Sequence, residues 1–146
     1  MILNRQSSVR VSVKDLDDFL ARARRVLRLQ ADSVGVCLVS NSAMARWNRA
    51  YRGKKGPTDV LSFRADKDTG LPQRSRQRAS DGYLGDIAIA PAVARRNARR
   101  FQRTFGEEMR ILILHGILHL MGYDHETDNG QMDRREKKLR RALGLA

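Results

Sequence analysis

The pattern of apolar and polar residues near the start of the chain predicts a strand followed by a helix. Residues 9–13 (Val-Arg-Val-Ser-Val) alternate as in a half-buried strand, and Ser12 with Asp15 three residues later is typical of a capping box that opens a helix. The apolar residues that follow recur at helical spacing, at Leu16, Phe19, Leu20, Ala23, Val26 and Leu27. The other surfaces of this helix carry Arg22, Arg24, Arg25 and Arg28. We therefore expect one buried face and a basic outer face.

A second strand and helix are predicted next. Residues 34–39 (Val-Gly-Val-Cys-Leu-Val) form an apolar run of strand length, and Ser40 or Asn41 is placed to cap the helix after it. One stripe of that helix consists of Met44, Trp47 and Tyr51. We interpret the stripe as core, because inward-facing aromatic residues are the commoner case. Base stacking by Trp47 and Tyr51 is the alternative.

The middle of the chain contains two further predicted strands separated by a polar segment. After a break at residues 53–57, residues 60–63 (Val-Leu-Ser-Phe) predict a short strand, and residues 83–90 predict another. Residues 64–82 are charged and nearly free of apolar side chains, which predicts a mobile basic loop. Three arginines of this loop either follow a nucleic-acid backbone or are simply solvated: Arg74, Arg76 and Arg78.

Two helices are predicted after the last strand. Pro91 is suited to the first position of a helix, which we expect to continue to about Phe105 and to end at Gly106. Glu107 suits the first turn of the next helix. Residues 111–121 are apolar nearly all round, so this second helix belongs at the centre of the fold.

The overall pattern indicates the α/β class. A final charged helix is predicted over residues 128–143, with an apolar stripe of Met132, Leu139 and Leu143. Strands that alternate with helices are typical of α/β folds. With 146 residues and no internal repeat, residues 1–146 are expected to form a single compact domain, in which helices pack on a mixed sheet around one central buried helix.

Composition adds an expected partner and compartment. A formal net charge of +13 and a pI near 11.1 predict attraction to a polyanion such as RNA, DNA or an acidic membrane, although solubility alone is an alternative reason for the charge. Cys37 is the single cysteine, which excludes an intramolecular disulfide, and its apolar strand favours a small buried side chain over a nucleophile. No apolar run approaches the roughly 20 residues of a membrane span, and no secretory leader is recognisable. We expect a cytoplasmic protein without a membrane or disulfide partner.

The three histidines of the chain are concentrated between residues 115 and 125. His115 and His119 are four residues apart, which places them on one helix face and within reach of one ion. Gly122 permits a left-handed turn, after which His125 can fold back as a third ligand. Three protein nitrogens with an open fourth position are typical of a catalytic metal centre. The spacing therefore predicts one zinc ion per chain, with nickel, copper and iron as alternatives.

Two other interpretations of the histidine segment are weaker. If His115 and His119 were ordinary core residues, each would need its own buried partner, because an unpaired polar group costs roughly 1–3 kcal/mol. In metzincin proteases, which share the spacing, a glutamate follows the first histidine and acts as general base. Here that position is Gly116, which cannot accept a proton. Asp124 could assist chemistry, but orienting a ligand or capping the turn is the favoured role.

Several motifs in a fixed order resemble one known family. Besides the histidine segment, they are Tyr51-Arg52, Pro57-Thr58-Asp59-Val60-Leu61-Ser62-Phe63, Leu84-Gly85-Asp86-Ile87, Met132 with Glu136, and Leu143-Gly144. From about residue 36 onward the chain is thereby similar to the YbeY-type endoribonucleases, which mature ribosomal RNA in bacteria. It departs from the usual family pattern at Arg64, where proline commonly follows the phenylalanine, and in its unusually basic 64–82 loop.

The resemblance implies a function and assigns one further residue. It implies a zinc-dependent, single-strand-specific endoribonuclease acting in 16S rRNA maturation and ribosome quality control, with zinc on His115, His119 and His125 and with Arg52 as the catalytic arginine. A guanidinium suits this role because it can hold two phosphate oxygens as charge develops. Its expected partners are single-stranded or ribosomal RNA, with the small ribosomal subunit as a candidate. Two rivals stay open: a metzincin-like metalloprotease, and a noncatalytic RNA-binding assembly factor with a structural metal.

Overall fold

The computed structural model describes residues 1–66, 82–124 and 126–145. Its sheet contains β1 (Ile2–Asn4), β2 (Val34–Leu38), β3 (Val60–Arg64) and β4 (Gly85–Ile89), in the order β1-β2-β4-β3. The strand pairs β1–β2 and β2–β4 are parallel, whereas β3 pairs with β4 in the antiparallel direction. The predicted α/β class with a mixed sheet is confirmed.

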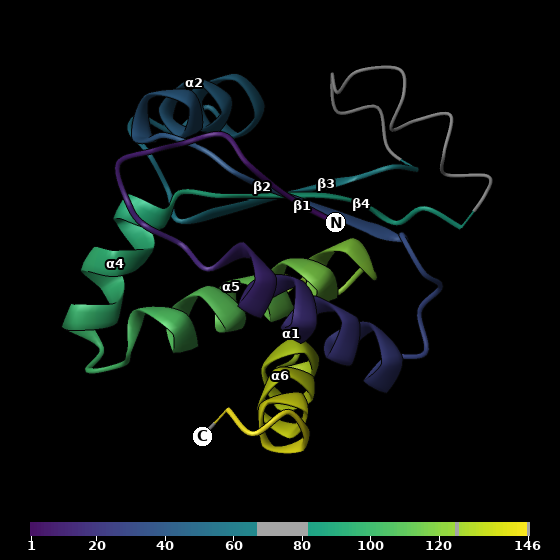
Figure 1. The fold of residues 1–146 in the computed structure, drawn as a ribbon. Coiled ribbons are helices and arrows are strands. Elements are labelled where there is room, and N and C mark those ends of the chain that lie inside the picture. Colours follow the sequence, from purple (N-terminus) through teal and green to yellow (C-terminus); the bar gives the residue numbers. More distant parts are fainter. Residues whose placement is uncertain (67–81, 125, 146) are drawn as a thin grey trace.

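Helices cover both faces of this sheet. Helix α2 (Asn41–Arg52) lies on one face, while α1 (Val13–Val26), α5 (Phe105–Leu120) and α6 (Gln131–Ala142) lie on the other (Figure 1). Helix α4 (Pro91–Arg100) packs against α5. The strand alternation explains how one sheet has two cores, because successive side chains point to opposite faces. On β4, Ile87 and Ile89 join the core around α5, whereas Ala88 joins the smaller core beneath α2.

Helix α5 is the centre of the fold, as its apolar sequence predicts. It contacts β3, β4, α1, α4 and α6. Its fully buried side chains include Ile113, Leu114, Ile117 and Leu118. Burial of each such aliphatic side chain contributes about 1.5–3 kcal/mol. The helix that carries His115 and His119 is therefore held in place by the main core.

The strand predicted over residues 9–13 is wrong. The first strand is Ile2–Asn4, and the helix already begins at Val13, with the Ser12 side chain accepting a hydrogen bond from the backbone N–H of Asp15. Residues 9–13 alternate because Val9 is buried and Val11 packs on the core while their neighbours face solvent. A segment that crosses a core outside any sheet has the same alternation as a strand, and a three-residue strand is too short to show a period.

The helix predicted from Pro91 to about Phe105 is also too long. It ends at Arg100, and Gly106 lies inside the first turn of α5. The reason is a capping box: Thr104 Oγ1 accepts from the N–H of Glu107 at 3.1 Å, and Glu107 Oε1 accepts from the N–H of Thr104 at 3.1 Å. This reciprocal pair begins α5 before the glycine.

The remaining sequence predictions are confirmed in part. Ser40 caps α2, and Met44 is buried, but Tyr51 is 40% exposed, so the core interpretation of the α2 stripe is wrong for this residue. Residues 67–81 of the predicted mobile loop, with its three arginines, lie outside the described residues, and Arg64 belongs to β3. Cys37 lies on β2, partly buried against the α2 core, and this burial raises the pKa of its thiol. Within the described ranges, no helix is both long and apolar enough to cross a membrane.

Candidate active site

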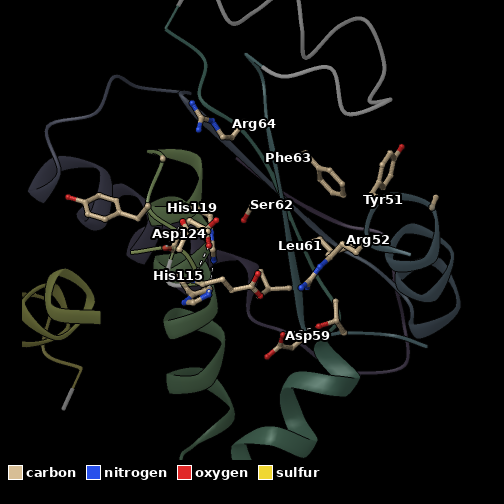
Figure 2. A pocket seen from close by; sticks show the side chains of 17 residues that line it. Tyr51, Arg52, Asp59, Leu61, Ser62, Phe63, Arg64, His115, His119 and Asp124 are labelled. Carbon is tan, nitrogen blue, oxygen red and sulfur yellow. Dashed lines mark hydrogen bonds between the residues drawn. The ribbon is translucent and has the colours of Figure 1, made fainter. Parts of the chain in front are cut away.

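A cleft of about 950 Å³ opens beside the C-terminal half of α5. Three separate parts of the chain line it: the last turn of α2, the β3 region from Thr58 to Arg64, and α5 with the turn that follows it (Figure 2). The polar side chains along its walls include Arg52, Asp59, Ser62, Arg64, His115, His119, Asp124 and Glu126. The cleft thus joins two of the predicted metal ligands, His115 and His119, with the predicted catalytic arginine.

His115 and His119 converge as the four-residue spacing predicts. Their Nε2 atoms lie 3.1 Å apart, and their ring planes meet at 71°. Two nitrogens bound to one tetrahedral zinc at about 2.0–2.1 Å would be separated by about 3.3 Å. The observed pair therefore fits two positions of a zinc coordination sphere with little rearrangement.

Glu136 on α6 fixes the orientation of His115. Its Oε1 lies 3.0 Å from His115 Nδ1, and its Oε2 lies 3.0 Å from Nη2 of Arg140 one helical turn later. Burial favours a higher pKa for this carboxyl, but the hydrogen bond with His115 and the Arg140 charge outweigh burial and lower the pKa below its ordinary value. Sequence reasoning noted Glu136 in the family motif without giving it a role, because the contact spans 21 residues that no local spacing relates.

The Glu136 contact also determines which nitrogen of a neutral His115 is available to an ion. With its lowered pKa, Glu136 is ionised at neutral pH, and an ionised carboxylate only accepts hydrogen bonds. Nδ1 of His115 must then be the donor. Nε2, which faces His119, is left with its lone pair, as a metal ligand requires.

The third predicted ligand, His125, lies outside the described residues. Among the residues that are described, no group of three or more His, Cys, Asp or Glu side chains is placed to hold a metal ion. The structure therefore shows a convergent pair and its carboxylate partner, and the three-histidine centre stays a prediction.

The chain leaves α5 through a sharp turn at Gly122, as predicted. Gly122 has φ +99°, a conformation that strongly favours glycine. The N–H of Gly122 bonds to the carbonyl of His119 at 3.0 Å, and that of Tyr123 bonds to the carbonyl of Leu118 at 3.1 Å. This Schellman arrangement ends the helix at Leu120, one residue after His119. Asp124 then accepts from the N–H of Glu126 at 3.0 Å, which confirms that it stabilises the turn.

Gly116 faces the sheet. A Cβ atom at this position would lie 2.8–3.0 Å from three side-chain atoms of Ile87 on β4, closer than packed carbon atoms tolerate. Its carbonyl accepts a hydrogen bond from Ser62 Oγ at 3.3 Å. At the position where metzincins carry the general base, this chain has a glycine that packs closely against the sheet. This difference argues against the protease interpretation.

Arg52 is the last residue of α2, and its exposed side chain is directed into the cleft (Figure 2). The wall beside it is aromatic: Tyr51 meets Phe63 edge to face with ring centroids 5.1 Å apart. Trp47 packs on the same ring at 6.1 Å. Phe63 is buried while Tyr51 is partly exposed, so Tyr51 presents an aromatic surface at the cleft.

Comparisons with known proteins show the family to which the chain belongs. The family described as Endoribonuclease YbeY matches residues 1–144. A protein of that name from Koribacter versatilis is 39% identical over 99% of this chain and 86% of its own length, and one from Solibacter usitatus is 41% identical over 84% and 76%. The solution structure of a Thermotoga maritima protein matches with a TM-score of 0.61 and 29% identity, over 98% of this chain and 89% of that one. The chain belongs to the YbeY endoribonuclease family.

Proposed function

We propose that residues 1–146 form one zinc-dependent endoribonuclease domain that cleaves single-stranded RNA. Its proposed role is 16S rRNA maturation and ribosome quality control in the cytoplasm, with ribosomal RNA and the small ribosomal subunit as partners. The observation that carries the proposal is the shared cleft, which brings the His115–His119 pair and Arg52 together from helices far apart in sequence. Family membership supplies the reaction class, cleavage of an RNA phosphodiester.

The residues of the cleft have distinct proposed roles. His115, His119 and His125 would hold one zinc ion, which when bound supplies Lewis-acid chemistry at the phosphate and a water of lowered pKa. Glu136 keeps the proton of His115 on Nδ1 and the ring in its orientation. Arg52 binds the non-bridging phosphate oxygens and stabilises the charge that accumulates on them during cleavage.

Cleavage of a labelled single-stranded RNA, with and without a chelator, tests this function. The purified protein should contain about one zinc ion per chain and cut the RNA; chelation should stop cleavage and added zinc should restore it. His119→Ala should lose both metal and activity. Binding of RNA without cleavage at any metal concentration would support the noncatalytic assembly factor. Casein hydrolysis that disappears in His119→Ala would support the protease.

A further inference from the structure

Arg64 lines the cleft, although it is a residue at which this chain departs from the usual family pattern. It ends β3 and lies two residues after Ser62, so the two side chains share a face of the strand. That face is turned toward α5, because Ser62 Oγ donates to the Gly116 carbonyl at 3.3 Å. In Figure 2, Arg64 lies at the upper end of the cleft, while Arg52 reaches in from α2 on the side opposite His115 and His119.

The guanidinium of Arg64 is held in a fixed plane. Its Nε and Nη2 donate to the two carboxylate oxygens of Asp66 at 3.1 and 2.8 Å, a bidentate arrangement. The side chain of Arg64 is only 36% exposed. A guanidinium has five N–H donors, so this pair leaves others available. Nη1 has no hydrogen-bond partner among the described residues.

The position of Nη1 identifies where a ligand would bind. Nη1 lies 3.7 Å from the place where a Cβ of Gly122 would stand, so it faces the turn that follows α5. Gly122 immediately follows the helix end that carries His119. An anion that accepts from Nη1 would therefore lie at the cleft wall next to the histidine pair.

The length of the wall suits a second phosphate. Strand β3 is extended from Val60 to Arg64, and its four steps of about 3.3 Å each span about 13 Å. Stacked nucleotides of one strand are spaced by about 3.4 Å, so the wall accommodates several of them. Arg52 and Arg64 come from different elements that line the cleft, α2 and β3, so each is placed to contact its own phosphate of one strand.

We propose that Arg64 forms a second phosphate-binding site, which holds a phosphodiester flanking the scissile one and directs the RNA strand along β3. This proposal rests on the proposed function. Because the flanking phosphate undergoes no reaction, Arg64 binds the ground state and the transition state alike. Its loss should raise KM without changing kcat, unlike loss of Arg52.

The experiment combines Arg64 variants with RNA in which one linkage at a time is replaced by an uncharged methylphosphonate. The cleaved bond is first mapped on the unmodified RNA. For the wild type, one flanking methylphosphonate should raise KM about tenfold. Arg64→Ala should raise KM about tenfold on unmodified RNA, with kcat unchanged, and should show no further increase with that same methylphosphonate. Arg64→Lys keeps the charge but loses the planar guanidinium, so its KM should lie between those of the wild type and Arg64→Ala.

Arg46→Ala is the matched control, since Arg46 is exposed on α2 and does not line the cleft. Arg46→Ala should show the same increase in KM with each methylphosphonate as the wild type does. Metal content and thermal midpoint of each variant separate a local effect from misfolding, and Arg64→Gln replaces Arg64→Ala if the latter unfolds. If Arg64→Ala and the methylphosphonate raise KM independently at every position, so that their effects multiply, the Arg64 site is overturned. The endoribonuclease function is not affected by that result. A wild type that cleaves no RNA would overturn both.

Discussion

His115 Nδ1 and Glu136 Oε1 lie 3.0 Å apart and join α5 to α6 at the cleft. The carboxylate holds one ring nitrogen protonated and directs the other toward His119. Since both oxygens of Glu136 are engaged, one by His115 and the other by Arg140, the histidine cannot rotate without breaking a charge-assisted hydrogen bond. Glu136 is therefore expected to determine how tightly the site binds its ion.

Replacing Glu136 by Gln should weaken zinc binding by about 10–100-fold, the usual effect of losing a carboxylate behind a metal-binding histidine. Glutamine keeps the shape of the side chain but removes the charge that fixes the Nδ1 proton. Competition with a chromophoric chelator measures the affinity. Asp133→Asn is the control, because Asp133 is an exposed acid on the same helix, paired with Lys137. Equal affinity in the Glu136→Gln and wild-type proteins would contradict the role of Glu136.

Arg52→Lys should bind RNA and zinc almost normally but cleave at least about tenfold more slowly, equivalent to about 1.4 kcal/mol in the barrier. Lysine keeps the charge and loses the planar fork that holds two oxygens. Single-turnover rates at saturating protein isolate the chemical step. Arg49→Lys, an exposed arginine of the same helix, is the matched control. If Arg52→Lys cleaves as fast as Arg49→Lys, Arg52 is one surface charge among many.

Gly116→Ala should destabilise the fold by about 1–2 kcal/mol, because overpacking costs about 1–3 kcal/mol and alanine regains only up to about 1 kcal/mol of helix propensity. Denaturant unfolding measures the change. Gly106→Ala on the same helix should be neutral or stabilising, since the nearest atom to its added Cβ is 3.6 Å away, at the end of Arg110. In an Ile87→Ala background the cost of Gly116→Ala should disappear. If Gly116→Ala still destabilises the Ile87→Ala protein, a clash with Ile87 is not the cause.

Affinity for single-stranded RNA should fall steeply as salt rises. The net charge of +13 implies that several phosphates are neutralised on binding, and each contributes about −0.7 to the slope of log affinity against log salt for a single strand. Binding by His115→Ala at several salt concentrations avoids cleavage during the measurement. A slope near zero would mean that the arginines do not form the RNA surface.

Alkylation of Cys37 should be slow at neutral pH and should accelerate only at a higher pH than for the unfolded chain. Partial burial raises its pKa, with a smaller opposing effect of Arg5, and only the thiolate reacts. Between neutral pH and the raised pKa, the folded protein contains less thiolate than the unfolded one. Iodoacetamide rates against pH, with and without denaturant, give the comparison. Identical profiles would show that the strand environment does not protect the thiol.

The sequence predicts those features that depend on neighbours along the chain. The His115–His119 pair follows from helix periodicity, and the turn at Gly122 follows from the preference of glycine for positive φ. The predicted end of α4 is wrong because the Thr104–Glu107 capping pair begins α5 before Gly106, so that this glycine does not end the preceding helix. Glu136 and Arg64 could not be assigned roles from spacing, since their contacts with the cleft depend on how α6 and β3 pack against α5.

Contacts across long stretches of sequence have a consequence for synthesis of the protein. The contact from Ser62 to Gly116 spans 54 residues, and the contact from His115 to Glu136 spans a further 21. A chain that is still being translated can form the contact from Ser62 to Gly116 once α5 has been made, but it cannot orient His115 through Glu136 until α6 has been made and has packed. The histidine pair therefore reaches its fixed orientation only late in synthesis, after the parts of the cleft wall that come earlier in the chain.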